Sequence, residues 1–445
     1  MVRFSIQYLY ERLTDSLLTL RKKKDIYYDL LNNLCKARML YERSLFEECF
    51  EILSDTIEQA TYYENNEVLT IALKLELEYL LRLNFPNLAE SELYHKHFMQ
   101  NEALKKTRKI VEQSSLHNLL KYRLSHIGSI RTSKQKQDMN DLMVNELSIA
   151  ASSGIEGNFE LMRNHRLFQA NYLMGAGEYK AALNSYKELS RLFEQNRQFW
   201  SNPPIYYLSA IQGILDSLCI AGLYHETPFF LSKLEELTQN EYSTEFILHL
   251  KTLIYIYKSN SLLQAGNFEQ ALELRDKQEN ELLKKVTSLG LESQLRLYLS
   301  FAVLGMYTKD YVQARKYMKK IFSLGKLFCA FPSYKIARLV NLLLQAELGN
   351  YDFFENEIIS IKRNIRFEKQ TYITEKLIFK FIQGYPLPSY EKARNKRWLQ
   401  YQKDIQKIEQ DKYERQLLKT FDVLAWIESK LTQRSLADIL AEKAH

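Results

Sequence analysis

The chain has 445 residues, of which 46% are hydrophobic and 26% are charged, and its formal net charge at pH 7 is +7. This composition excludes a disordered chain and allows a sizeable core. Only 13 glycines and 7 prolines interrupt it, and its many Tyr and Phe residues recur among Leu, Glu, Lys and Gln without strand-like alternation, so we expect an all-α protein.

The N-terminal residues predict a helix with an apolar stripe formed by Phe4, Leu9, Leu13, Leu17 and Leu20. Charged residues, Glu11, Arg12 and Asp15, stand within this stripe, which is not typical of a secretory signal or a membrane span. The strongest apolar run, "YLSFAVLGMY", is much shorter than the roughly 20 residues that cross a bilayer. We therefore expect a soluble, cytoplasmic protein.

A helical hairpin recurs along the chain. In "MGAGEYKAALNSYKEL", residues 174–189, Gly175 and Gly177 end one helix and a second begins near Tyr179. Equivalent turn residues, 40 to 45 residues apart, follow at Tyr224, Phe268, Tyr311 and Tyr351; upstream copies stand at Phe46 and, more weakly, at Leu88. The third residue after the turn is small in all copies except at Phe354; these small residues are Cys49, Ser91, Ala182, Thr227, Ala271 and Ala314.

Such a period is typical of two-helix repeats that stack into an α-solenoid and bury their apolar faces on their neighbours. The alternative is an irregular helical bundle whose turns happen to fall evenly. We expect the repeats to occupy residues 1–365. After a break at Pro386 and Pro388, a charged helix and a last helix around Trp426 follow, so residues 366–445 are predicted to form capping helices continuous with the solenoid.

The turn pattern resembles that of tetratricopeptide repeats. The pattern is Gly, an acidic or amide residue, an aromatic residue, two further residues and Ala, as in Gly177 to Ala182 and Gly266 to Ala271. The usual unit has about 34 residues; these units are longer, and Arg166 replaces the large first-helix residue, so the chain resembles a long-helix variant. The stretch "ARLVNLLLQAELGNYDFFENEI" is similar to a group of uncharacterised bacterial tetratricopeptide-type proteins. That resemblance implies a fold and no activity.

A row of polar residues stands eight positions before three successive turn residues: Asn171, Asp216 and Asn260. In the repeats that the chain resembles, this helix lines a concave groove, and the matching position often faces bound peptide. Amide and carboxylate groups can clamp a peptide backbone, so we predict a partner-binding groove at these three residues. Val303 and Leu343 interrupt the row further on. Ordinary solvent exposure is the alternative.

Residues 101–140 carry most of the net charge. This segment has three acidic residues and nine basic ones, which are Lys105, Lys106, Arg108, Lys109, Lys121, Arg123, Arg131, Lys134 and Lys136. Such a basic patch can attract an acidic protein segment or nucleic-acid phosphates. A solvated helix face with a basic loop is the alternative reading.

Signatures of catalysis and of cofactor binding are missing from the sequence. Phosphate loops, zinc-protease motifs and nucleophile elbows do not occur, and the four cysteines are scattered without a CxxC pair. His95 and His97 are two residues apart and lie on different faces of a helix, so we expect no metal site. We predict a non-enzymatic scaffold, without cofactors, that binds a peptide or helix of a partner protein. The alternative is a regulator that contacts nucleic acid through residues 101–140, and an enzyme of unrecognised type is the third option.

Overall fold

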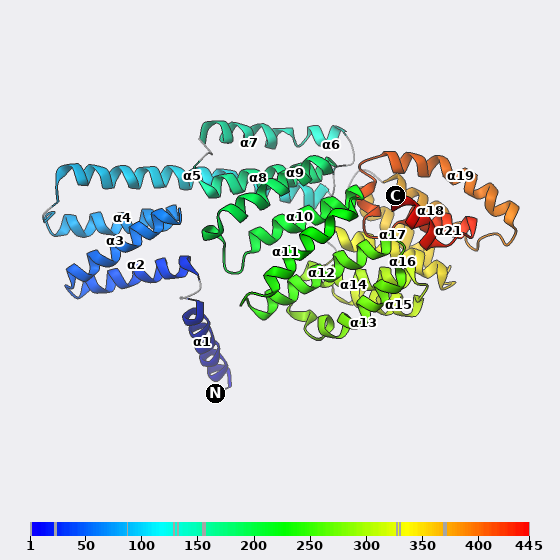
Figure 1. Cartoon of the computed structure of the whole chain (residues 1–445), viewed down its shortest axis with the longest axis horizontal. Helices are drawn as coiled ribbons and strands as arrows, with labels where there is room; N and C mark the ends of the chain where they lie inside the picture. The colour runs from blue at the N-terminus through cyan, green and yellow to red at the C-terminus, as the bar shows by residue number, and fades with distance from the viewer. Residues whose placement is uncertain are drawn as a thin grey trace. The chain divides into compact units, whose positions relative to one another are not determined.

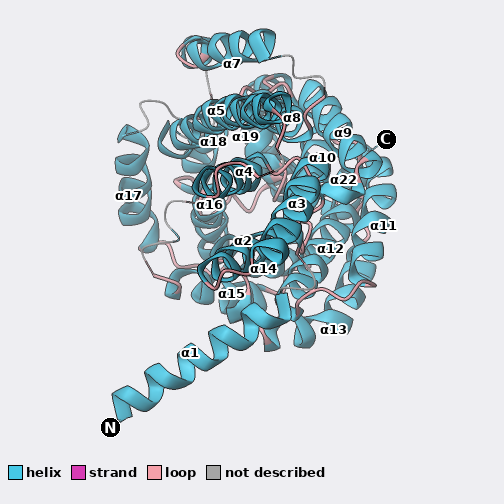
Figure 2. Cartoon of the chain, turned by 90° about the vertical axis from the view of Figure 1, so that its left-hand side faces the viewer, coloured by secondary structure: helices cyan, strands magenta, loops and turns pink. Residues whose placement is uncertain are grey.

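The computed structural model describes residues 2–21, 25–86, 88–127, 130, 133–153, 157–325, 328, 331–367 and 372–444. All regular secondary structure in these residues is helical, and Figure 2 shows helices joined by loops. The all-α prediction is therefore confirmed. Helices that are adjacent in sequence pack against each other, as the hairpin pattern predicts. Within the described residues, no helix is both long and apolar enough to cross a membrane.

The chain divides into two compact units, and Figure 1 labels most of their helices. The first unit contains residues 1–118, 142–168 and 189–207. Its helices are α1 (Val2–Arg21), α2 (Ile26–Glu42), α3 (Phe46–Tyr62), α4 (Asn66–Arg82), most of α5 (Glu90–Ile127) and most of α7 (Asn140–Ser153), with the short helix η1 (Arg197–Phe199).

The core of the first unit lies between α2, α3 and α4. Leu30, Cys49, Leu53 and Ala72 are buried there. By contrast, the described apolar side chains of the predicted α1 stripe are exposed: Leu9, Leu13 and Leu17 are 59–64% accessible.

The second unit contains residues 119–141, 169–188 and 208–445. Five helices contribute residues to both units: α5 and α7, whose bounds are given above, and α8 (Phe159–Gly175), α9 (Tyr179–Gln195) and α10 (Ile205–Ala221). The others are α6 (Ser133–Gln137), α11 (Thr227–Thr238), α12 (Thr244–Gln264), α13 (Phe268–Lys284), α14 (Leu291–Tyr307), α15 (Tyr311–Ser323), α16 (Pro332–Glu347), α17 (Phe353–Phe367), α18 (Ile373–Ile382), α19 (Glu391–Gln410), α20 (Arg415–Leu418), α21 (Val423–Thr432) and α22 (Leu436–Ala444), with η2 (Tyr224–Glu226) and η3 (Val286–Ser288).

The turns of the predicted copies share one backbone geometry. The residue two positions before the turn residue is left-handed in six of them, with φ between +62° and +76°: Ser44, Gly177, Gly222, Gly266, Lys309 and Gly349. At the turn before Tyr179, the N–H of Glu178 donates to the carbonyl of Leu173 at 2.9 Å. This bond satisfies a carbonyl that the helix end leaves free. A glycine suits this position because it carries no Cβ that would clash at positive φ.

The small residue after each turn is where helices approach closely. Cys49, Ala182, Ala271 and Ala314 have no exposed surface. The copy at Leu88 differs, because α5 begins only at Glu90 and Ser91 is exposed.

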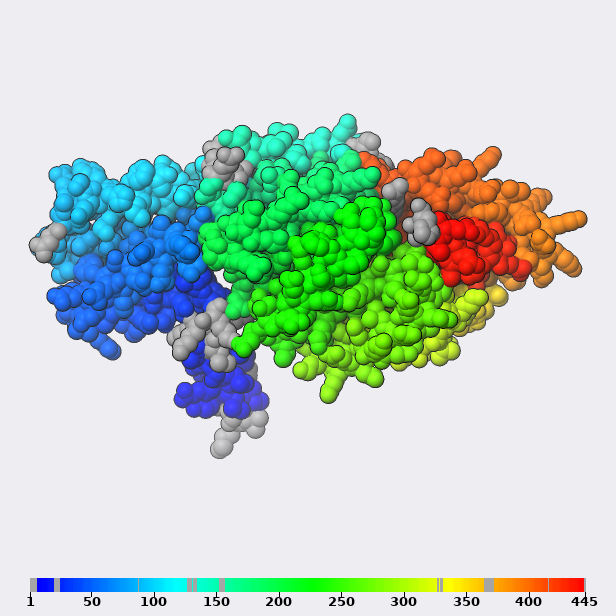
Figure 3. All heavy atoms as spheres, in the orientation of Figure 1, coloured from blue at the N-terminus to red at the C-terminus, as the bar shows by residue number. Residues whose placement is uncertain are grey.

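The C-terminal helices belong to the second unit and pack along it. The Asp422 N–H donates to the Tyr307 hydroxyl at 2.8 Å, and Lys430 pairs with Glu347 at 2.7 Å. Helix α22 lies against α12. Helix α21 packs on α19, and Figure 3 shows the red C-terminal residues beside the orange ones. Residues 372–444 therefore contact the hairpins with turn residues Phe268, Tyr311 and Tyr351 and do not only cover the last.

Candidate binding cavity

The three predicted groove residues all lie on first helices of hairpins, and each makes a contact within the second unit. Asn171 on α8 accepts a hydrogen bond from the Tyr186 hydroxyl at 3.2 Å. Tyr186 comes from α9, the second helix of the same hairpin. Its ring lies against Gly213 on α10, where an added Cβ would stand 2.4 Å from a ring carbon. Asn171 therefore supports hairpin packing.

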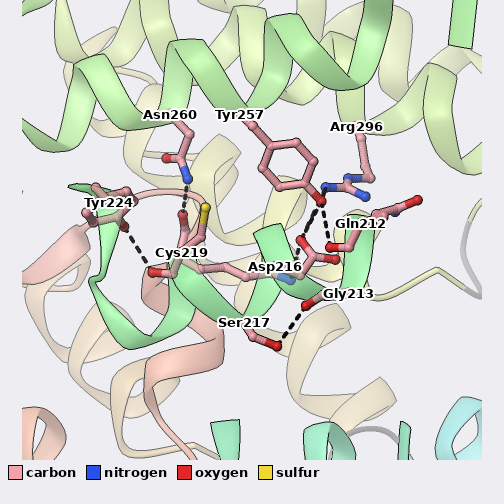
Figure 4. Close-up of polar contacts among 10 residues, drawn as sticks. Gln212, Gly213, Asp216, Ser217, Cys219, Tyr224, Tyr257, Asn260 and Arg296 are labelled. Carbon is pink, nitrogen blue, oxygen red and sulfur yellow. Dashed lines mark hydrogen bonds and ion pairs between the residues drawn. The ribbon is translucent and has the colours of Figure 1, made fainter. Parts of the chain in front are cut away.

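Asp216 on α10 is the centre of a mostly buried polar cluster (Figure 4). Its Oδ1 accepts a hydrogen bond from the Tyr257 hydroxyl at 3.0 Å. The same oxygen lies 3.4 Å from Nη2 of Arg296 and 3.7 Å from Nζ of Lys419. Burial alone would raise the pKa of the Asp216 carboxyl, but Lys419 and Arg296 hold that pKa below its ordinary value. The carboxylate is therefore ionised at neutral pH.

Asn260 on α12 holds the backbone of the C-terminal segment. Its Nδ2 donates to the carbonyl of Lys419 at 3.2 Å. Lys419 stands in the irregular stretch between α20 and α21. Asp216 and Asn260 therefore contact an irregular segment of this chain, whereas Asn171 contacts Tyr186 within its own hairpin.

A cavity of about 200 Å³ adjoins this cluster. Corresponding faces of α10, α12, α14 and α16 line it, and Lys419 and Thr420 of the C-terminal segment close it. Its polar lining includes Gln212, Asp216, Glu292, Arg296 and Ser333, and its apolar lining includes Ile256, Leu263, Leu299, Val303 and Ile336. Convergent polar groups beside apolar side chains are typical of a ligand site.

No protein-family model matches the chain, and no curated protein matches it. The functional assignment of the cavity consequently rests on its own geometry and chemistry.

Cys219 lines the cavity, but its thiol is not prepared for nucleophilic chemistry. Burial and the neighbouring Asp216 raise its pKa to about 12, so the thiol is protonated at neutral pH. The polar groups around the cavity can form hydrogen bonds and ion pairs.

The predicted basic patch is divided between the two units. Lys105, Lys106, Arg108 and Lys109 lie in the first unit; Lys121, Arg123, Lys134 and Lys136 lie in the second; Arg131 lies outside the described residues.

Several of these cations already hold carboxylates. Lys105 pairs with Glu102 at 2.7 Å, and Arg108 pairs with Glu112 at 3.0 Å. In the second unit, Arg123 donates two hydrogen bonds to Asp141, and Lys136 pairs with Glu178 at 3.0 Å. Lys106, Lys121 and Lys134 are exposed.

Sequence reasoning missed Tyr257, Arg296 and Lys419. Arg296 stands seven residues before Val303, two helical turns along the same face as the row position, so extending the row toward the helix N-terminus could have found it. Lys419 lies outside the repeats, and nothing in the spacing of the repeats indicates that it meets Asp216.

Proposed function

We propose that the chain is a non-enzymatic protein–protein interaction scaffold, an α-solenoid of long tetratricopeptide-like hairpins. Its partner is a peptide segment of another protein, which binds in the cavity lined by α10, α12, α14 and α16. The observation that carries this proposal is that four successive first helices each contribute the same face to one cavity. Helical repeats use such faces to hold extended segments over several units.

The contact between Asn260 and the Lys419 carbonyl supports the peptide assignment, because it is the kind of side-chain-to-backbone contact that a bound segment would make. The nucleic-acid alternative has less support. Many phosphate contacts need many available cations, and four of the eight described basic residues in the patch pair with carboxylates of the chain.

A library of random dodecapeptides displayed on phage tests the proposal. The full chain should select peptides, and Ser333→Trp, which places a large ring at the cavity, should lose them. Val312→Trp is the matched control, because Val312 on α15 is 76% exposed and does not line the cavity. Equal peptide binding by Ser333→Trp and Val312→Trp would reject this site, and selection of no peptide would reject the proposed function.

A further inference from the structure

Two cations of the cavity share one carboxylate oxygen. Arg296 and Lys419 both approach Oδ1 of Asp216, at 3.4 and 3.7 Å, and the Tyr257 hydroxyl donates to that same atom. Strong ionic hydrogen bonds are shorter, about 2.7–2.9 Å. Asp216 therefore holds both cations at long range and leaves much of their hydrogen-bonding capacity unused.

The guanidinium of Arg296 has spare donors. Its two hydrogen bonds, to Asp216 and to Tyr257, both come from Nη2, so Nε and Nη1 have no partner within the described part of the chain. The side chain is only 16% exposed and lines the cavity. A guanidinium presents five N–H donors in a fork that matches a carboxylate, and the remaining donors of Arg296 are available to an acceptor in the cavity. An acceptor supplied by a ligand would satisfy them.

The rest of the cavity favours one negative charge and disfavours several. Ser333 stands in the first turn of α16, which contains no acidic residue, and a helix N-terminus attracts negative charge. Glu292, four residues before Arg296 on α14, lines the same cavity and is exposed. Lys121 also interacts electrostatically with Glu292. Three cations therefore face Asp216 and Glu292, and the excess of one positive charge is balanced by a single carboxylate but exceeded by a doubly charged phosphate.

We propose that the cavity recognises an acidic side chain, Asp or Glu, of the partner peptide, whose carboxylate binds between Arg296 and Lys419. Apolar neighbours of that residue pack on the wall formed by Ile256, Leu299 and Ile336. This inference rests on the proposed function and specifies the chemistry of its partner.

Three peptide sub-libraries test this inference. They carry Glu, Gln or phosphoserine at a fixed central position and apolar residues at randomised flanking positions. The full chain should bind the Glu peptides about tenfold more tightly than the matched Gln peptides, which corresponds to about 1.4 kcal/mol. Arg296→Gln should abolish this preference, and Lys419→Gln should reduce it. Glu292→Gln should tighten the binding of Glu peptides, because it removes a repelling charge.

Lys277→Gln is the matched control, since Lys277 is 76% exposed on α13 and does not line the cavity. Should Arg296→Gln unfold, the opposite effects of Lys419→Gln and Glu292→Gln carry the test. Equal binding of Glu and Gln peptides, or tighter binding of phosphoserine peptides, would overturn the inference and leave the proposed function standing. Absence of binding to every sub-library would count against the proposed function itself.

Discussion

The glycine at the turn before Phe268 offers a sharp test of how the C-terminal helices pack. Gly266 has φ of +76°, and a Cβ added there would stand 2.6 Å from the carbonyl oxygen of Ala437 on α22. Gly222, at the preceding turn, has φ of +74°, and a Cβ added there would meet nothing within 4 Å. The two glycines therefore share a backbone conformation and differ in their surroundings.

Gly222→Ala should lower the free energy of unfolding only by the strain of a left-handed backbone that carries a Cβ, about 1–2 kcal/mol. Gly266→Ala carries that cost and must also displace the backbone of α22. Overpacking of this kind typically costs about 1–3 kcal/mol. We therefore expect Gly266→Ala to lower the free energy of unfolding by about 2–5 kcal/mol in total, with the difference between the two variants reporting the contact with α22.

Denaturant unfolding followed by tryptophan fluorescence measures this difference. In a Trp200→Phe background the signal comes from Trp398 and Trp426, which both lie in the second unit. If Gly266→Ala were no more destabilising than Gly222→Ala, α22 would not pack on this turn, and the placement of Lys419 beside the cavity would lose its support.

Three further predictions concern titration and reactivity. Burial and, secondarily, Arg296 lower the pKa of His249 to about 4. Because the unfolded residue titrates near its ordinary value of about 6.5, the free energy of unfolding should fall by up to about 3 kcal/mol between pH 6.5 and 4. Acid unfolding curves of a His249→Gln variant measure this, and a variant that kept the whole slope would contradict it. The pKa of Asp216 is lowered, so the stabilisation that this carboxylate provides is present above its ordinary pKa and is lost as the pH falls below that value. Asp216→Asn should lower the free energy of unfolding by about 3 kcal/mol at neutral pH, because it leaves two cations unpaired. An unchanged melting temperature would refute this. In native protein at about pH 8, iodoacetamide should label the exposed Cys35 well before the buried Cys219, with peptide mass mapping as the readout; equal labelling rates would show that Cys219 is accessible.

The sequence predicted the hairpins because their turns depend on local chemistry. A glycine at positive φ and a small residue in close helix contact, such as Gly177 and Ala182, recur at regular intervals in the sequence. The copies that lack glycine, at Ser44 and Lys309, adopt the same turn, so the neighbouring pattern determines the conformation there. The weak copy at Leu88 is the one in which the expected small residue, Ser91, is exposed.

The composition of the cavity could be predicted only in part. Asp216 and Asn260 stand in a register that the repeat reveals, and both border the cavity. Their partner Lys419 is more than 150 residues away in the chain, and such long-range contacts leave no periodic signal. The separation of the basic residues into two units likewise depends on tertiary contacts that charge counting does not capture.

Site-specific photo-cross-linking tests the central claim most directly. A photoreactive phenylalanine replaces Glu292, which is exposed and lines the cavity, or, as control, Val312 on the exposed face of α15. Each protein is irradiated with a peptide selected by the full chain. The account predicts a cross-link from position 292 that excess unlabelled peptide suppresses, and none from position 312. Cross-linking from 312 without cross-linking from 292 would place the partner elsewhere and contradict the assignment of the cavity.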